Sequence, residues 1–204
     1  MRRGGSAEWA IAGRADTGRM TAPVSAAASR TAHTADLTPA ELHAIRALLD
    51  DAFDGDFSDE DFEHGLGGMH VLVHDDAGLL VAHGSVVMRR VRHRDRWLRV
   101  GYVEAVAVRP DARRTGLGGL VMAELERVVD RAYDAGMLSA SDEGAALYAA
   151  RGWQVWSGRI CGLGLDGVVH LPDEEGGTFV RTALAGPLDP TFELVFDWRD
   201  GDVL

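Results

Sequence analysis

The chain has 204 residues, of which 46% are hydrophobic and 26% are charged, the balance of a single soluble globular domain. No apolar run reaches the roughly 18 residues of a membrane-spanning helix, and no apolar stretch follows the basic start as in a secretory signal. The single cysteine, Cys161, excludes an internal disulfide and a four-cysteine zinc site. Together with eight histidines that show no metal-ligand spacing, these features favour a cytoplasmic protein without a metal.

The basic residues are informative because all 21 of them are arginine. A chain without lysine cannot be a Walker A nucleotide-binding protein, a Schiff-base enzyme or a pyridoxal enzyme, since each of these classes requires a lysine. The net charge of −11 argues against general nucleic-acid binding. It suits a protein that receives cations, although solubility alone explains it equally well.

The N-terminal region, residues 1–28, is rich in small and polar residues without an apolar period, so we predict a disordered tail before one domain over 29–204. Thr38 begins a helix as its N-cap, and Glu41, three residues later, completes a capping box. Apolar residues then recur at helical spacing. Ser58 caps a second, short helix.

The rest of the domain alternates between strands and helices. Three β-branched runs predict an antiparallel meander over residues 69–74, 79–90 and 97–108, with the arginine-rich stretch 91–96 joining the last two. The later elements are a helix over 116–135 that ends at Gly136, a strand over 137–140, a helix over 143–151, and strands at Val155 and 178–183. This order predicts an α+β fold of mixed α/β layers.

A glycine-rich segment, Arg113 to Gly119, stands between the third predicted strand and the long helix. Glycines let the backbone approach a ligand, and a helix N-terminus with free N–H groups attracts anions, so the segment predicts a phosphate site. A literal dinucleotide fingerprint occurs at 162–167, but no helical period follows it, and we discount it. The arginines between Arg89 and Arg99 read as a solvated basic ridge, so a ribose phosphate is better placed on Arg113 or Arg114.

Several segments resemble one family in order along the chain. The strand 101–108, the motif Arg113-x-x-Gly116-x-Gly118 and the motif Leu147-Tyr148-x-x-x-Gly152-Trp153 resemble the acetyl-CoA site of the GNAT N-acetyltransferases. More narrowly, the segments 52–57, 66–70, 101–104 and 197–203 look like those of the aminoglycoside 2'-N-acetyltransferases. One departure is Leu204, which stands where the family has an aromatic residue.

The resemblance implies a GNAT fold, with a central mixed and mostly antiparallel sheet that is flanked by helices and splays open between two parallel strands to hold acetyl-CoA. It also implies a cytoplasmic, antibiotic-modifying homodimer that uses no metal. The backbone of 106–108 would pair with the pantetheine arm, and the loop would hold the pyrophosphate. The implied cofactor contacts are Val106, Ala107, Val108, Arg113, Arg114, Thr115, Gly116, Leu117 and Gly118.

Acetyl transfer to an amine requires a base for the ammonium, a donor to the thioester oxygen and an acid for the thiolate. Glu104 interrupts an apolar strand and is predicted to be the base, acting through water; the alternative is a hydrogen-bonded strand carboxylate. Tyr148 is predicted to be the acid, and its alternative role is aromatic core packing. The backbone N–H of Val106 is the expected oxyanion donor.

An aminoglycoside acceptor carries several ammonium groups, so its site should use carboxylates. Residues 50–63 hold eight acids and no base, and residues 166–204 hold nine acids and two arginines, although most such residues belong to a solvated face. The resemblance singles out as substrate contacts Asp56, Glu104, Ala105, Ser139, Asp173, Glu174 and Asp202.

The sequence therefore predicts acetyl-CoA-dependent acetylation of the 2'-amine of aminoglycosides. Another amine or hydroxyl acceptor, such as a cell-wall sugar, a polyamine or a peptide terminus, is the alternative within enzymes. A non-catalytic acyl-CoA-binding module is the alternative from another class. Glu104 and Tyr148 argue against it, since a binding module needs neither.

Overall fold

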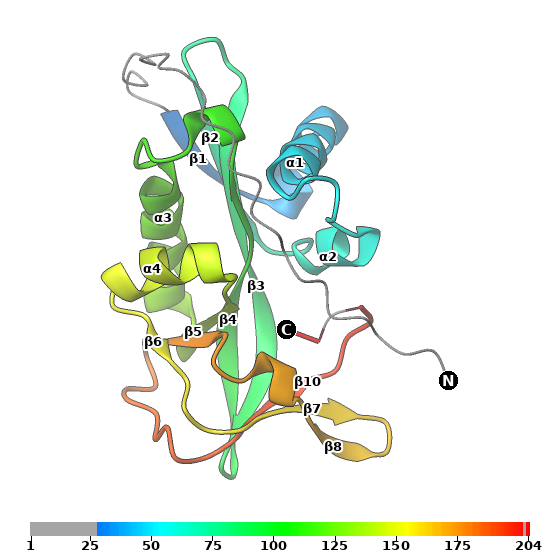
Figure 1. Cartoon of the computed structure of the whole chain (residues 1–204), viewed down its shortest axis with the longest axis vertical. Coiled ribbons are helices and arrows are strands. Elements are labelled where there is room, and N and C mark those ends of the chain that lie inside the picture. Colours follow the sequence, from blue (N-terminus) through cyan, green and yellow to red (C-terminus); the bar gives the residue numbers. More distant parts are fainter. Residues whose placement is uncertain (1–27, 202) are drawn as a thin grey trace.

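The structure is a computed structural model that describes residues 28–201 and 203–204 (Figure 1). The predicted tail and Asp202 therefore lie outside the described residues, apart from Ala28, which begins the first strand. The strands are β1 (Ala28–His33), β2 (Met69–His74), β3 (Leu80–His93), β4 (Arg96–Val108), β5 (Ala135–Ser139), β6 (Gln154–Val155), β7 (Ile160–Gly164), β8 (Gly167–His170), β9 (Thr178–Thr182) and β10 (Leu194–Asp197). The α-helices are α1 (Pro39–Ala52), α2 (Asp59–His64), α3 (Leu117–Ala132) and α4 (Asp142–Ala150), with short 3-10 helices η1 (Thr34–Asp36), η2 (Pro110–Ala112) and η3 (Pro172–Glu174).

One curved sheet contains all the described strands, and its axis is the long β3–β4 hairpin (Figure 1). The strand order is β6-β9-β5-β4-β3-β10-β7-β8. The first half of β3 also pairs with β2, which pairs in turn with β1, and the second half of β3 pairs with β10. Most pairs are antiparallel, whereas β4–β5 and β10–β7 are parallel. The predicted mixed and mostly antiparallel sheet is therefore confirmed.

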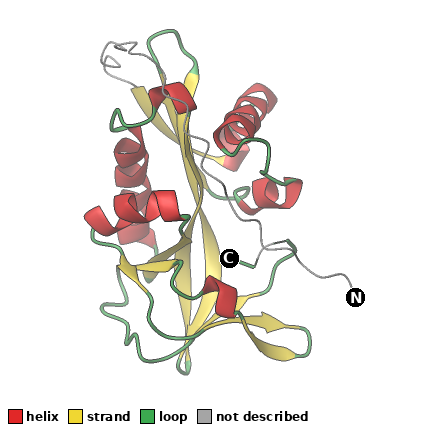
Figure 2. Ribbon diagram, viewed as in Figure 1, coloured by secondary structure: helices red, strands yellow, loops and turns green. Residues whose placement is uncertain are grey.

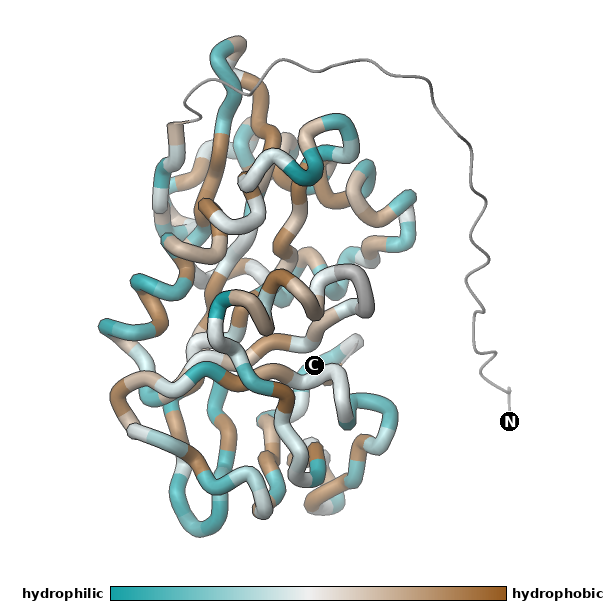
Figure 3. The backbone as a smooth tube through the Cα atoms, turned by 60° about the vertical axis from the view of Figure 1, so that its left-hand side comes forward, coloured by the Kyte–Doolittle hydropathy of each residue, from teal (hydrophilic) through white to brown (hydrophobic). Residues whose placement is uncertain are grey.

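Helices cover both faces of the upper part of the sheet in the view of Figure 2. α3 and α4 lie on one side, and α1 and α2 lie on the other. Alternation along β2 explains the two layers, because Val71 and Val73 pack in the cluster beneath α3 while Leu72 packs in the cluster beneath α1. Hydrophobic segments accordingly follow the central strands (Figure 3). No helix among the described residues is long and apolar enough to cross a membrane.

The sheet opens between β4 and β5. These parallel strands pair only at Val100, Gly101 and Tyr102, opposite residues 135–137. Beyond Tyr102, β4 continues to Val108 and β5 to Ser139 without further pairing between them. This split is the feature that the resemblance implied for the acetyl-CoA site.

The helix starts agree closely with the sequence. Thr38 and Ser58 are N-caps with complete capping boxes, closed by Glu41 and Asp61. The long helix was overestimated, since α3 ends at Ala132 and Gly136 lies inside β5 rather than after a helix. A Cβ on Gly136 would come within 2.8 Å of Val129 Cγ1 and 3.0 Å of the Trp153 ring, so this glycine lets β5 pass close to α3.

Other elements were shorter in the prediction or missed. The predicted connection 91–96 is mostly strand, because the hairpin turns only at Arg94 and Asp95, and Arg94 adopts a left-handed φ of 58°. β1, β7, β8 and β10 were not predicted. The fingerprint 162–167 forms the turn of the β7–β8 hairpin, where Gly164 pairs with Gly167, so it opens no helix and was rightly discounted.

Candidate active site

A β-bulge on β4 lies at the edge of the split. Opposite β3, His83 pairs with Ala107 and Ser85 pairs with Glu104, so β4 carries one extra residue in this interval. Ala105 takes the strain with a left-handed φ of 52°, which a non-glycine residue rarely adopts. The bulge therefore re-aims the side chain of Glu104 and the amide of Val106, the two groups to which the sequence assigned proton and oxyanion chemistry.

The cofactor end of the site is the loop before α3. Gly116 is the N-cap in a left-handed conformation, φ 92°, and no side chain caps the first turn of the helix. A Cβ on Gly116 would meet nothing within 4 Å, so the backbone there is openly accessible. The uncapped N–H groups at the start of α3 thus form a donor set that fits a diphosphate.

The other predicted cofactor residues divide by their contacts. The Arg113 guanidinium donates to Val108 O at 3.4 Å and to Ala52 O at 2.7 Å, so it ties the loop to β4 and to the end of α1. Thr115 Oγ1 donates to Ala112 O at 2.6 Å. Arg114 is exposed and is the better-placed cation for a phosphate.

Two members of the loop contribute through the backbone. The Leu117 side chain is buried in the core beneath α3, which leaves its amide for a ligand. A Cβ on Gly118 would lie 3.4 Å from the Leu147 side chain of α4. This is an ordinary van der Waals distance, so packing against the helix that carries Tyr148 would not by itself exclude a side chain at this position.

Tyr148 is buried on α4, with its ring 6.4 Å from the Trp153 ring and 6.0 Å from the Phe179 ring. Burial raises the pKa of the Tyr148 phenol to about 12. The phenol therefore keeps its proton throughout the neutral range. A protonated phenol can serve as a general acid, so the core packing of this residue and its predicted chemical role are compatible.

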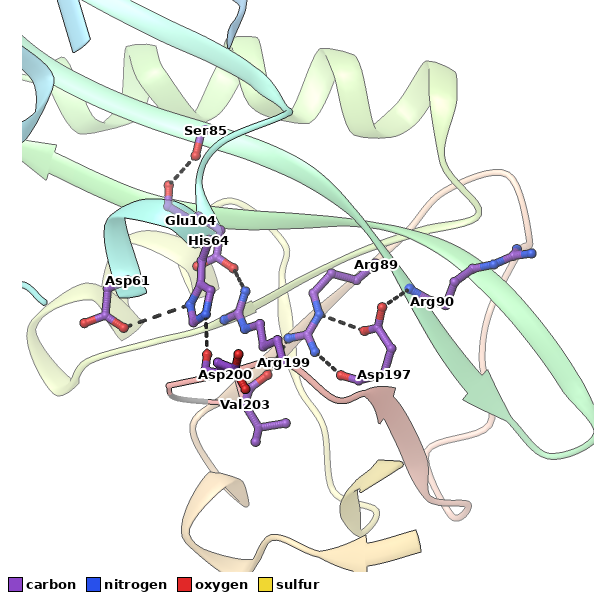
Figure 4. Close-up of polar contacts among 10 residues, drawn as sticks. All are labelled: Asp61, His64, Ser85, Arg89, Arg90, Glu104, Asp197, Arg199, Asp200 and Val203. Atoms are coloured by element: carbon purple, nitrogen blue, oxygen red, sulfur yellow. Dashed lines mark hydrogen bonds and ion pairs between the residues drawn. The ribbon is translucent and has the colours of Figure 1, made fainter. Parts of the chain in front are cut away.

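Glu104 forms an ion pair that the sequence did not predict. Arg199 Nη1 lies 2.5 Å from Glu104 Oε1, and both side chains are largely buried (Figure 4). The Arg199 guanidinium also lies 5.6 Å from the centroid of the Tyr102 ring. Arg199 thus holds a positive charge next to the carboxylate of Glu104, the predicted base, close to the point where the split begins.

The C-terminal segment, which runs from Asp197 to the end of the chain and carries Arg199, is anchored at both ends (Figure 4). Arg89 donates to Asp197 Oδ1 at 3.0 Å and to Val203 O at 2.5 Å. His64, at the end of α2, contacts Asp200 O at 2.7 Å. Arg89 is only 4% exposed, so its assignment to a solvated ridge was wrong: its guanidinium is withdrawn to hold this segment.

A pocket of about 390 Å³ lies beside the C-terminal segment. Its lining includes Asp173 and Glu174 of η3, Trp198, and Gly201 and Val203 on either side of Asp202. Ser139 Oγ, at the end of β5, donates to Glu174 Oε2 at 3.2 Å and so links the pocket to the split. The structure therefore brings Ser139, Asp173 and Glu174 together.

Asp56 is not among the residues that line this pocket; it is exposed in the loop between α1 and α2. Of the residues that sequence reasoning missed, Arg199 had a signal, because it is one of two arginines among the nine acids of the C-terminal region. Arg89 had none, because nothing local distinguishes it from the arginines around it. The described residues contain no cluster of three or more histidine, cysteine or acidic side chains suited to a metal.

Comparison with known proteins identifies the family of the chain. A family described as an acetyltransferase (GNAT) domain matches residues 33–156. An aminoglycoside 2'-N-acetyltransferase of Mycolicibacterium fortuitum is 47% identical over 178 residues, covering 86% of this chain and 91% of that protein.

Two solved structures share the fold at low sequence identity. The GNAT N-acetyltransferase YhbS of Escherichia coli, in complex with CoA, has a TM-score of 0.62 at 20% identity, covering 89% of this chain and 94% of that one. An acyl-CoA N-acyltransferase of Pseudomonas aeruginosa has a TM-score of 0.54 at 20% identity, covering 77% and 100%. The chain belongs to the GNAT acetyltransferases and, within them, to the aminoglycoside 2'-N-acetyltransferase family.

Proposed function

We propose that this enzyme transfers the acetyl group of acetyl-CoA to the 2'-amine of aminoglycosides. The observation that carries the proposal is the acidic pocket joined to the split of the sheet through the Ser139–Glu174 hydrogen bond, in a chain 47% identical to an aminoglycoside 2'-N-acetyltransferase. An acidic pocket beside an acetyl-transfer site suits an acceptor with several ammonium groups.

The loop before α3 would bind the pyrophosphate of acetyl-CoA through the first amides of the helix, with Arg114 adding a positive charge. The open strand edge at 106–108 would accept the pantetheine arm as an added strand. Acetyl-CoA supplies an activated thioester. The chain's own residues then orient the acceptor, remove its proton and protonate the leaving group.

Glu104 takes the proton from the acceptor's ammonium, through water, and so makes the amine nucleophilic. Arg199 holds the same carboxylate in place at 2.5 Å. An acceptor ammonium that enters the pocket would share this carboxylate with Arg199. The charge on Glu104 thus both attracts the acceptor and accepts its proton.

The amine attacks the thioester carbonyl, and a carbon–nitrogen bond forms as the carbon–sulfur bond breaks. The nitrogen releases its second proton to water in this step and becomes the amide nitrogen. The Val106 N–H stabilises the developing oxyanion. Tyr148 gives its proton to the leaving thiolate and regains one from solvent. Its pKa of about 12, raised by burial, keeps this proton available at neutral pH.

Recognition of the sugar would rest on carboxylates and a hydroxyl around the pocket. Ser139, Asp173 and Glu174 lie at its edge or in its lining. Asp202, between two lining residues, and the backbone at Ala105 would complete the contacts. Asp56 would meet the outer part of the acceptor from the loop between α1 and α2.

A panel of acceptors tests the proposal. Tobramycin and gentamicin carry a 2'-amine and should be acetylated, whereas kanamycin A and amikacin carry a 2'-hydroxyl and should be poor substrates. A misplacement of about 1 Å can cost about 100-fold in rate, so amines elsewhere on the molecule should not substitute. Thiol release together with NMR of the products reads out both rate and position. Efficient acetylation of kanamycin A would show that the enzyme acetylates an amine at another position, which would contradict the proposal.

We further propose that the enzyme is a cytoplasmic homodimer whose activity confers antibiotic resistance, as the family resemblance implies. The β7–β8 hairpin offers apolar side chains for self-association, since Leu165 is exposed in its turn and Val168 and Val169 are exposed on opposite faces of β8. Light scattering of the wild type and of Leu165→Asp tests the dimer. A change in minimum inhibitory concentration upon expression tests resistance.

A further inference from the structure

Two buried histidines connect the β4 bulge to Thr34, the first residue of η1. His83 on β3 and His70 on β2 are 1% and 2% exposed. His83 Nδ1 lies 3.1 Å from Ala105 O, and His83 Nε2 lies 3.0 Å from His70 Nδ1. His70 Nε2 lies 2.8 Å from Thr34 Oγ1. The proposed mechanism uses none of these side chains.

The hydrogen bonds fix the tautomer of each ring. A carbonyl oxygen only accepts, so His83 must donate from Nδ1 to Ala105 O, which leaves its Nε2 as an acceptor. His70 must then donate from Nδ1 to His83 Nε2, which leaves its own Nε2 as an acceptor that faces the Thr34 hydroxyl. That hydroxyl also lies 3.2 Å from Gly68 O, its other acceptor. Burial lowers the pKa of His70 to about 4 and that of His83 to about 3, so both rings stay neutral at neutral pH.

The neighbours of His83 on β3 complete a cradle for the bulge. Ser85 Oγ donates to Glu104 O at 3.5 Å. Gly84 lies between His83 and Ser85 on β3. A Cβ at Gly84 would come within 2.7 Å of Val121 Cγ1 and 3.3 Å of Val106 Cγ2. The residues 83–85 thus contact the bulge at Glu104, at Ala105 and at Val106.

Resting on the proposed function, we propose that His83, oriented by His70, is a positioning residue that holds the Ala105 bulge and thereby aims Glu104 and the Val106 amide. The Ala105 carbonyl at the bulge receives the His83 N–H, and this bond opposes relaxation of the left-handed φ at Ala105. His70 contributes by fixing the His83 tautomer, in the way that outer partners orient catalytic groups.

A pair of nearly isosteric substitutions tests this role. His83→Asn keeps an N–H close to the position of Nδ1, whereas His83→Leu removes it. We expect His83→Leu to lower kcat about 10- to 100-fold with little change in KM for acetyl-CoA, while His83→Asn stays within about threefold of wild type. Val91→Ala, a buried change elsewhere on β3, controls for lost stability and should leave kcat unchanged.

Nitrogen NMR of the histidine side chains tests the geometry without reference to activity. The proposal expects both His83 and His70 to carry their proton on Nδ1 near neutral pH. Protonation of His83 on Nε2, or equal loss of kcat in the Asn and Leu variants, would overturn it. If the wild type acetylates no aminoglycoside, the proposed function fails while the NMR result still decides the hydrogen-bond chain.

Discussion

The two halves of the site are built in different ways. The cofactor half comes from one continuous stretch, the end of β4 and the loop into α3, completed by Tyr148 on α4. The acceptor half is assembled from β4, the end of β5, η3 and the C-terminal segment, which are far apart in the sequence. The first half is held mainly by local geometry, with one long-range hydrogen bond from Arg113 to Ala52 O, whereas the second depends on long-range ion pairs and hydrogen bonds throughout.

This difference predicts that the two halves can be disabled separately. A substitution in the loop before α3 should weaken acetyl-CoA binding and leave the acceptor pocket intact. A substitution that breaks a contact of the C-terminal segment should weaken acceptor binding and leave acetyl-CoA binding unchanged. The junction between them, at Tyr148 and the β4 bulge, should affect the chemical step most.

The largest effect is expected at the junction. Tyr148→Phe should lower kcat by about 10²- to 10⁴-fold with both KM values nearly unchanged, because it removes only the proton donor from a ring that stays packed on Trp153 and Phe179. Tyr133→Phe, at the end of α3, makes the same chemical change elsewhere. Steady-state kinetics measure both variants, and equal rates for Tyr148→Phe and wild type would remove Tyr148 from the mechanism.

The next effect isolates the cofactor half. Gly116→Asp should weaken acetyl-CoA binding about 100- to 1,000-fold, because it places a negative charge where helix N–H groups would meet phosphates. Gly116→Asn has nearly the same shape and tolerates the left-handed φ, so it should bind far more tightly than the Asp variant. Calorimetry with acetyl-CoA compares the two. The same affinity in both would show that charge at this position is irrelevant.

The contrast between the halves also explains what the sequence could predict. The loop before α3 was predictable because glycines, arginines and a helix start occur together within seven residues. Glu104 was singled out because it interrupts the apolar strand before that loop, and Tyr148 because it lies in a motif that resembles the GNAT family. Nothing local, however, shows that Arg199 reaches Glu104, which precedes it by 95 positions. Strands β1 and β10 escaped for the same reason, since their pairing partners lie far along the chain.

The helix and strand ends follow the same rule. The α1 cap was predictable because Thr38 and Glu41 contact each other directly. The end of α3 was not, because Asp134 N donates to Arg99 O and Arg99 N donates to Asp134 Oδ2, so a strand 35 residues earlier directs the chain into β5. Tertiary contacts thus end the helix at Ala132, before the predicted boundary at residue 135.

A third prediction concerns stability at the bulge. The pKa of His83 is lowered from 6.5 to about 3 by burial, so the unfolded chain binds more protons than the folded one below pH 6.5. Stability should therefore be complete above pH 6.5 and fall as the pH decreases, by roughly 2 kcal/mol from His83 alone at pH 5. Urea unfolding of wild type and His83→Asn at pH 7.5 and pH 5 should show a smaller loss in the variant. An equal loss in both would assign the acid sensitivity to other groups.

A fourth prediction isolates the acceptor half. Arg199→Met keeps an apolar stem against Tyr102 but removes the charge that joins the C-terminal segment to Glu104. We expect KM for tobramycin to rise about 10-fold, because the largely buried, charge-assisted bond that is lost joins the C-terminal segment, which lines the acceptor pocket, to Glu104. The affinity for acetyl-CoA should stay within about twofold. Arg92→Met breaks a more exposed pair with Glu193 at 3.6 Å and should change neither value. Weakened acetyl-CoA binding in Arg199→Met would mean that the halves are not separable.

The smallest effect is expected at Asp56, in a loop next to a contact of the cofactor half. The loop that carries Asp56 follows α1, and Arg113 of the cofactor half donates to Ala52 O at the end of that helix. Asp56→Asn should raise KM for tobramycin about three- to tenfold, because it removes one exposed charge-assisted contact with an ammonium group.

The matched control for Asp56 is Asp54→Asn, an exposed change two residues away at a left-handed position that asparagine tolerates. If Asp56 makes a specific contact, KM for tobramycin should rise in Asp56→Asn and not in Asp54→Asn. This difference in KM between the two variants should become smaller at high salt, because salt screens an exposed charge. An equal rise in both would show that this loop attracts the acceptor only through its overall negative charge. The acceptor half would then end at the pocket beside η3, and Arg113 would serve the cofactor loop alone.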